Sequence, residues 1–191
     1  MFTRTKFAKS QTAFFRWWAD TFFKERYGHR ALVLETVAGV PGMVGGMLTH
    51  LRSLRRLEKE SGDRIHELLA EAENERQHLM FMMEVVQPSR LERVIIVLAQ
   101  FLFWHYYLVM YLLSSKTAHL MTAYFEEEAV KSYTTYLELI GKGRITASKA
   151  PLAAIEYYSL REDATIYDMI SCIREDERRH SEANHRMSKE A

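Results

Sequence analysis

Hydrophobic residues recur at helical spacing along almost the whole chain, interrupted by short polar breaks. The pattern predicts six helical segments, at about residues 11–25, 30–57, 63–86, 91–113, 117–139 and 165–187. Pro41 lies inside the second segment, so we expect a kink there. Gly42 and Gly46 are four residues apart, a spacing that lets a neighbouring helix approach closely. Asp63 is the expected N-terminal cap of the third segment, and residues 142–163 are expected to be a polar connector.

The composition supports a helical fold and limits the chemistry of any metal site. A chain of 191 residues has the length of one domain, so we expect residues 1–191 to form a single domain. Eight Gly and three Pro leave little material for the turns of an all-β protein, and we predict an all-α fold. Cys172 is the only cysteine, which excludes an intrachain disulfide and a cysteine zinc site. Any metal must then be held by histidine and carboxylate side chains.

The first thirty residues are basic and aromatic. They hold seven Lys and Arg against two acidic residues, although the formal net charge of the chain is only +1. Their aromatic residues include Phe14, Phe15, Trp17, Trp18, Phe22 and Phe23. This combination is typical of a helix that lies on an anionic membrane surface. The alternative is a solvated basic arm, which would not need the aromatic rings. The balanced total charge gives no reason to expect a nucleic-acid partner.

Carboxylates and histidines recur in an order that suggests a metal centre. Glu75 with His78, and Glu177 with His180, are Glu-x-x-His pairs, which a helix places on one face. A single glutamate precedes each pair on its own predicted helix, Glu35 before the first and one of residues 126–128 before the second. Di-iron carboxylate bundles use this set, and such ligands suit iron or manganese. The alternative is that these residues are solvent-facing charges and capped core histidines.

A third pair, Glu182 with His185, does not belong to this set. It lies five residues beyond the second pair, hence about 140° around the same helix, and cannot face the same site.

Residues 94–113 carry no charge over twenty positions, which by length alone makes them a candidate membrane span. In one continuous helix Glu126 would lie about 57 Å from the turn at Pro88, and His78 only about 15 Å from it. A break at residues 114–116 removes this conflict by returning the chain along the bundle. We therefore predict a ferritin-like four-helix bundle, with the N-terminal segment and residues 91–113 forming a membrane-interfacial surface. A single span remains the alternative.

Four sequence blocks also resemble a known family. They are RYGHRALVLETVAGVPGMVGG, NERQHLM, FEEEAVKSYT and EDERRHSEANH. These blocks are similar to the signature blocks of the alternative oxidases, the cyanide-insensitive quinol oxidases, and the similarity runs from about residue 20 to the C-terminus. The resemblance implies a non-haem enzyme with two iron ions that oxidises ubiquinol and reduces O2 to water without pumping protons. It also implies a homodimer attached to one leaflet of a membrane, either a bacterial inner membrane on its cytoplasmic face or a mitochondrial inner membrane on its matrix face.

The resemblance also implies roles for individual residues. The implied iron ligands are Glu35, Glu75, His78, Glu126, Glu177 and His180. The implied quinol pocket is lined by Arg30, Leu34, Glu128, Ala129 and Ser132. The residues implied to support the ligands are Asn74, His119, Tyr157 and Asp176. Tyr133 is implied to lie near the iron pair, and its place two turns after Glu126 gives the hypothesis that it stores an oxidising equivalent. The alternative is a packed ring with a satisfied hydroxyl.

The chain departs from the usual family pattern at several positions. Lys131 stands where histidine is common, Tyr158 where tryptophan is usual, and Phe125 where leucine is usual. The pair Arg178–Arg179 replaces Ala-His. No implied ligand is lost, but Phe125 and Lys131 flank the expected pocket and are expected to affect binding of the quinol.

Two other classes of protein would explain part of the sequence. A ferritin-like protein for iron binding or storage would use the same ligands, but it should have a polar exterior. A non-catalytic, membrane-interacting helical module would need none of the ligands, so that Glu177 would contribute only its charge.

Overall fold

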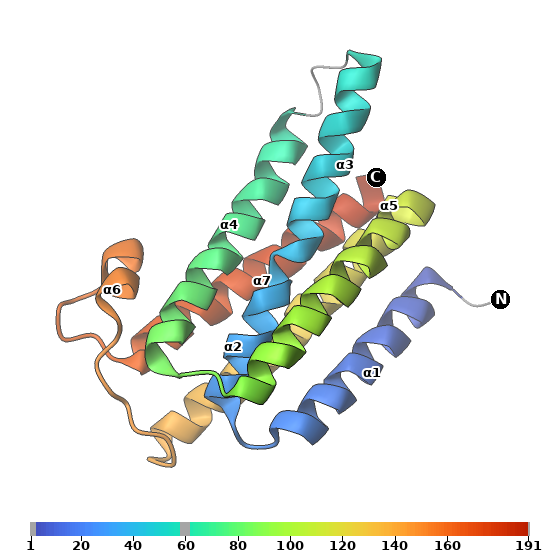
Figure 1. Cartoon of the computed structure of the whole chain (residues 1–191). Helices are drawn as coiled ribbons and strands as arrows, with labels where there is room; N and C mark the ends of the chain where they lie inside the picture. The colour runs from blue at the N-terminus through green and yellow to red at the C-terminus, as the bar shows by residue number, and fades with distance from the viewer. Residues whose placement is uncertain (1–2, 58–61, 191) are drawn as a thin grey trace.

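The computed structural model describes residues 3–57 and 62–190, and these are helical almost throughout (Figure 1). The helices are α1 (Arg4–Phe23), α2 (Tyr27–Ala38), α3 (Val40–Arg56), α4 (Gly62–Val85), α5 (Arg90–Gly141), α6 (Leu152–Tyr158) and α7 (Ile166–Glu190). Within these ranges the only strand-like pairing is an isolated bridge between Lys149 and Thr165. The predicted all-α class is confirmed.

Two helices, α2 and α3, replace the single kinked helix expected at 30–57. The chain breaks at Gly39, which ends α2 and precedes α3, so the kink expected at Pro41 is wrong in its position. Pro41 lies in the first turn of α3, where the N–H that proline lacks would have no helical partner. Gly42 lies so close to α4 that a Cβ on it would meet the carbonyl oxygen of Leu68 at 2.5 Å. This close approach agrees with the glycine spacing.

Three other boundaries differ from the expectation. Helix α1 begins at Arg4 rather than near residue 11, because the Thr3 hydroxyl accepts a hydrogen bond from the Lys6 amide at 3.3 Å and caps it. Helix α4 begins at Gly62, so Asp63 lies in its first turn and is not its cap. Helix α6 falls within the expected polar connector; at seven residues it is too short to show a helical period.

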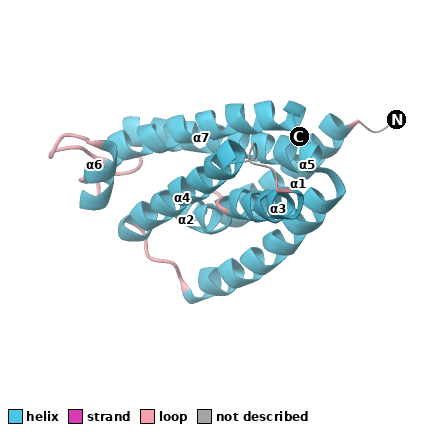
Figure 2. Ribbon diagram, turned by 90° about the horizontal axis from the view of Figure 1, so that it is seen from above, coloured by secondary structure: helices cyan, strands magenta, loops and turns pink. Residues whose placement is uncertain are grey.

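Helix α5 consists of two antiparallel halves, residues 90–113 and 115–141. Ser114 between them has non-helical backbone angles (φ −164°, ψ 101°), in the predicted break. Its hydroxyl accepts hydrogen bonds from the amide and the hydroxyl of Thr117, at 3.3 and 2.9 Å, and caps the second half. Thr122 lies 3.4 Å from the hydroxyl of Tyr107, so residues of the two halves are side by side. Figures 1 and 2 show the chain turning back at this point.

The bundle interior lies between four helical segments: α2 with α3, α4, the second half of α5, and α7. One core cluster contains side chains from all four, among them Leu32, Phe81, Tyr136 and Met169. Helix α1 and the first half of α5 pack outside this interior, and the rings of Phe15 and Phe103 meet there at 5.3 Å between centroids. The predicted four-helix bundle with two additional helices therefore agrees with the structure.

Two segments are long and apolar enough to cross a membrane by length and composition, Tyr27–Arg56 and Arg90–Gly141. The most apolar stretch of the first is mostly buried in the bundle, whereas only 17% of that of the second is buried. The surface of α1 and the first half of α5 is accordingly apolar. Its exposed residues include Phe14, Trp17, Leu91, Val94, Val97, Leu98, Phe101, Leu102, Val109, Leu112 and Leu113. We call this set the apolar face.

Candidate metal centre

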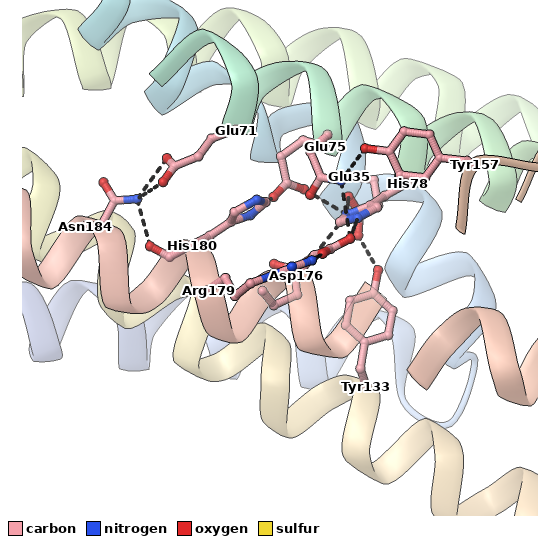
Figure 3. A network of polar contacts seen from close by, with 12 residues as sticks. Glu35, Glu71, Glu75, His78, Tyr133, Tyr157, Asp176, Arg179, His180 and Asn184 are labelled. Atoms are coloured by element: carbon pink, nitrogen blue, oxygen red, sulfur yellow. Dashed lines mark hydrogen bonds and ion pairs between the residues drawn. The ribbon is translucent and has the colours of Figure 1, made fainter. Parts of the chain in front are cut away.

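The bundle brings the six expected ligands to one place in its interior. They come from the four core segments: Glu35 from α2, Glu75 and His78 from α4, Glu126 from the second half of α5, and Glu177 and His180 from α7. All six side chains are buried. Figure 3 shows the residues of α2, α4 and α7 converging between the helices. Because residues 35 and 180 are so far apart in sequence, only the tertiary fold can create this cluster.

The donor atoms form two adjacent groups. Glu35, Glu75, His78 and Glu177 offer ligand atoms that all lie within 4.8 Å of one another, and so do Glu75, Glu126, Glu177 and His180. Glu75 and Glu177 belong to both groups. Two neighbouring ions could therefore share these two carboxylates, each ion having one histidine and one further glutamate of its own.

Unpaired atoms show that the site fits metal ions. Buried atoms of Glu35, Glu75, His78 and Glu177 lack an ordinary hydrogen-bond partner and lie only beside other members of the cluster, as Oε1 of Glu75 does at 2.7 Å from Nδ1 of His180. Nδ1 of His78 lies 3.2 to 3.6 Å from the carboxylates of Glu177, Glu75 and Glu35, although one N–H can serve only one of them well. Each charged or polar group that is buried without a partner costs about 1–3 kcal/mol or more of folding free energy. Cations would satisfy all these atoms together.

The pKa values indicate a cluster that requires positive charge. Burial, and then the charge of Glu75, raises the pKa of Glu35 and that of Glu126 to about 7. Burial also raises the pKa of Glu177 well above its usual value, with the charges of Glu75 and Glu126 adding to the effect. Burial disfavours the charged form of His180, but the hydrogen bond with Glu75 and the negative charges of Glu75, Glu126 and Glu71 together outweigh this and raise the pKa of His180 to about 9. Without metal, protons thus take the place of cations in the cluster, and metal binding must displace them.

Among the expected supporting residues, Asp176 contacts a ligand directly, and Asn74 and Tyr157 are linked to that ligand through Asp176. Oδ2 of Asp176 lies 3.2 Å from Nε2 of His78, the ring nitrogen that faces away from the cluster. The Asn74 amide donates to Asp176 at 3.3 Å and to the hydroxyl of Tyr157 at 2.9 Å. The hydroxyl of Tyr158 also donates to Asp176, at 2.6 Å.

His119 occupies a different position from the other three. Its Nδ1 lies 3.0 Å from the side-chain oxygen of Asn184, and no contact with a ligand side chain is formed by this residue in the described part of the chain. The Asn184 amide donates to Glu71 at 3.0 Å and to the backbone carbonyl of His180 at 3.0 Å. His119 therefore connects to His180 only through Asn184.

Glu71 and Asn184 were missed in the sequence. Burial raises the pKa of Glu71 to about 8. Both residues lie one helical turn from a ligand, Glu71 before Glu75 and Asn184 after His180, which is the spacing that places them on the same helix face. That spacing could have identified them.

A large apolar cavity connects the metal cluster with the apolar face. It has a volume of about 690 Å³, and Glu35, Glu126, Glu177 and Tyr133 line its inner end. Trp18, Leu98 and Leu102 line it on the side of the apolar face. The five residues of the expected quinol pocket, Arg30, Leu34, Glu128, Ala129 and Ser132, all line the same cavity.

The wall of this cavity is mostly apolar, and its charged side chains away from the metal cluster form ion pairs. Arg30 is buried and forms an ion pair with Asp20, but its Nε has no partner. Glu128 is held by Arg16 at 2.8 Å and by Lys131 at 2.7 Å. Lys131, which stands where histidine is common in the family, therefore takes part in an ion pair at the cavity wall.

Two aromatic residues complete the cavity wall. Phe125 packs its ring against Phe15 at 5.4 Å, so this departure enlarges an aromatic cluster. The hydroxyl of Tyr133 donates a hydrogen bond to Glu35. Burial, followed by the charge of Glu35, raises the pKa of Tyr133 well above its usual value, which keeps the phenol protonated.

A second, polar cleft of about 660 Å³ lies on another side of the cluster. It is lined by Glu71, Asn74, Asp176, Arg179 and His180, among others. The metal cluster thus borders the apolar cavity at Glu35, Glu126 and Glu177, and it borders the polar cleft at His180.

Comparison with known proteins gives the same family throughout. The family model "Alternative oxidase" matches residues 2–189. "Ubiquinol oxidase, mitochondrial" of Mangifera indica is 52% identical over 180 residues, which cover 94% of this chain and 56% of that protein. The protein of the same name from Batrachochytrium dendrobatidis is 52% identical over 172 residues, 90% of this chain and 54% of that protein. "Ubiquinol oxidase 1c, mitochondrial" of Arabidopsis thaliana is 51% identical over 170 residues, 89% and 51%. The chain spans about half the length of the curated relatives it matches.

The buried carboxylates lead to a prediction about stability. Replacing Glu177 by Gln keeps the shape of the side chain and removes a carboxyl group whose charged form is costly to bury, so the metal-free variant should unfold at a temperature no lower than the wild type. Metal ions should raise the unfolding temperature of the wild type, because they bind only the folded state, and should raise that of the variant far less. Calorimetry with and without Mn²⁺ measures both effects. A metal-induced rise of equal size in the two proteins would contradict the assignment of Glu177 as a ligand.

Proposed function

Because the chain belongs to the alternative oxidase family, we propose that it is a quinol oxidase that passes electrons from ubiquinol to O2 at a centre of two iron ions. Water is the product, and no protons are pumped. Two quinols give up four electrons and four protons, and one O2 takes up the same number to form two waters. Iron ions held in the cluster would supply the redox chemistry that couples these two half-reactions.

The observation that carries the proposal is the shared wall of the cavity and the metal cluster. Glu35, Glu126 and Glu177 line the cavity and are also members of the ligand set. An apolar substrate that enters between α1 and α5 would come to rest beside the metal ligands without crossing water. An iron-storage protein needs a polar route for ions and has no use for an apolar cavity that opens toward the apolar face.

The ligand assignment follows from the two groups of donor atoms. We propose Glu35 and His78 as ligands of one ion, Glu126 and His180 as ligands of the other, and Glu75 and Glu177 as ligands shared by both. His78 and His180 would each bind through Nδ1, since this nitrogen faces the carboxylates in both rings. Their orientation is then set by the groups behind them.

Within the cavity, Arg30 is the proposed donor to a quinol oxygen. Its ion pair with Asp20 fixes the guanidinium, and its buried Nε is left without a partner. A guanidinium in an apolar cavity forms a strong, directional hydrogen bond to an oxygen acceptor. Leu34, Glu128, Ala129 and Ser132 are the proposed remaining walls of the quinol pocket.

Tyr133 is the proposed catalytic tyrosine. Its hydroxyl holds its proton and donates it in a hydrogen bond to Glu35, a proposed ligand. The phenolic proton therefore has an acceptor next to it, as the hypothesis that Tyr133 stores an oxidising equivalent requires.

Asn74, Tyr157 and Asp176 are proposed to support His78, and His119 to support the helix turn that carries His180.

We further propose that the chain, as one domain, attaches to one leaflet of a membrane through the apolar face. The face is formed by α1 and the first half of α5, and basic residues such as Arg16 of α1 and Lys24, which follows α1, accompany it. Residues of the same two segments line the cavity, so we propose that ubiquinol enters between them from the lipid. The relatives named as mitochondrial favour a mitochondrial membrane; the bacterial membrane stays a prediction.

A homodimer is proposed through a different surface. Helix α3 carries an exposed apolar stripe at the spacing of one helix face, formed by Met43, Met47, Leu51 and Leu54. Leu69 of α4 is exposed as well. A second copy of the chain would cover such a stripe on both partners. Detergent-solubilised protein that sediments as a single chain would contradict this proposal.

Oxygen consumption tests the proposed function. Membranes that contain the protein should consume O2 when ubiquinol is supplied and cyanide blocks haem-copper oxidases. Glu177→Ala should abolish this uptake because a shared ligand is lost, and Tyr133→Phe should lower it strongly. Glu182→Ala is the matched control, since Glu182 lies on the same helix but is exposed and pairs with Arg178. Bound iron without any uptake would instead support an iron-storage protein.

Membrane attachment can be tested with lipid vesicles. Phe101 is 62% exposed on the apolar face, and Leu152 is 66% exposed on α6, away from it. Phe101→Glu should weaken binding to anionic vesicles by about tenfold or more, since burying one large apolar side chain contributes about 1.5–3 kcal/mol. Leu152→Glu should leave binding unchanged. Equal binding by the two variants in a vesicle flotation assay would exclude the apolar face as the attachment surface.

A further inference from the structure

The two histidines of the metal cluster differ in what lies behind them. Nε2 of His78 is 3.2 Å from Oδ2 of Asp176, while Nδ1 of the same ring faces the ligand carboxylates (Figure 3). A proton on Nε2, shared with Asp176, leaves the lone pair of Nδ1 free for a metal. His180 has no carboxylate hydrogen-bonded to it in this position: within residues 3–57 and 62–190 its ion pair is with Glu75, on the side of the metal, and Glu71 acts on it only through its charge.

Asp176 is itself held by three other side chains. The hydroxyl of Tyr158 donates to Oδ2 at 2.6 Å, and the amide of Asn74 donates to the same oxygen at 3.3 Å. The guanidinium of Arg179 forms an ion pair with Oδ1, the other oxygen. Asp176 is only 3% exposed, so it depends on these groups to remain charged in the interior.

Arg179 and Tyr158 come from different helices and contact different oxygens of Asp176. Arg179 lies three residues along α7 and reaches Asp176 from the polar cleft, where its own side chain is 63% exposed. Tyr158 is the last residue of α6 and packs its ring against Phe81 in the core. Both are positions where the sequence departs from the family pattern, and the two departures meet on one carboxylate.

We propose that Arg179 and Tyr158 are positioning residues that hold Asp176 against His78 and thereby make the His78 side of the centre the tighter of its two metal positions. The inference rests on the proposed metal centre. It assigns no contact with substrate to either residue. Their effect passes through Asp176, which fixes the ring that carries the metal-binding nitrogen.

Cobalt binding to the metal-free protein tests this inference. Co²⁺ is titrated in and followed by its visible absorption and by calorimetry, which give an affinity for each position. We expect two ions per chain with unequal affinities. Asp176→Asn should weaken the tighter position by about 10–100-fold, the range for a residue directly behind a ligand. Tyr158→Phe and Arg179→Ala should weaken the same position by about three- to tenfold, because each removes only part of the support and Arg179 is largely solvated.

Two further variants separate positioning from general stability. Arg179→Lys keeps the charge and should restore most of the affinity that Arg179→Ala loses. Arg178→Ala is the matched control, since this neighbour pairs with Glu175 and Glu182 on the surface and should leave both affinities unchanged. If Arg179→Ala does not fold, Tyr158→Phe provides the test alone, because it removes one hydroxyl and keeps the ring.

The outcomes distinguish this inference from the proposed function. Wild-type protein that binds no cobalt would overturn the metal centre and the inference with it. Wild-type protein that binds two ions, with Tyr158→Phe and Arg179→Ala binding equally well, would overturn the inference alone. So would an equal loss at both positions, or a loss of the same size in Arg178→Ala.

Discussion

Four carboxylates buried within reach of one another are the feature on which the rest of this molecule depends. Like charges at this separation repel strongly in a buried environment of low polarity, and burial alone already disfavours them. The raised pKa values of Glu35, Glu126 and Glu177 are the consequence in the absence of metal. A fold that keeps such a cluster must have a use for the cations that relieve it, and the surrounding helices must be held firmly enough to resist its opening.

Two breaks in the helices bring the ligands together in this cluster. The interruption at Gly39 lets α2 present Glu35 while α3 continues in its own direction against α4. The turn at Ser114 returns α5 along the bundle, so that Glu126 lies at the level of His78 and not far beyond it. The same turn leaves the first half of α5 outside the bundle, where with α1 it covers the cavity and forms the apolar face. One local break thus links the metal site to the proposed membrane attachment.

The ligands could be predicted from sequence because their spacing reflects helix geometry: two Glu-x-x-His pairs and two single glutamates, each on its own helix. The break at residues 114–116 was predictable for the same reason, since a continuous helix could not serve one centre.

Other features depend on tertiary contacts that no local pattern encodes. Gly39, where the chain breaks, lies close to α4, since a Cβ on it would meet the carbonyl oxygen of Ala72 at 3.2 Å, and α6 buries Ala154 and Ile155. The link from His119 to His180 runs through Asn184, so it depends on how α5 and α7 pack together. The convergence of Tyr158 and Arg179 on Asp176 likewise appears only when α6 and α7 are placed together.

The number and coupling of iron ions in the purified protein test the central claim most directly. Elemental analysis gives the iron content per chain, and a Mössbauer spectrum of the same oxidised sample shows whether the ions interact. If Glu75 and Glu177 are shared as their positions in both donor groups suggest, about two irons per chain are expected, with their ferric spins coupled to a diamagnetic ground state. A single iron per chain, or two ferric ions with independent paramagnetic spectra, would contradict a centre in which two carboxylates bridge the metals.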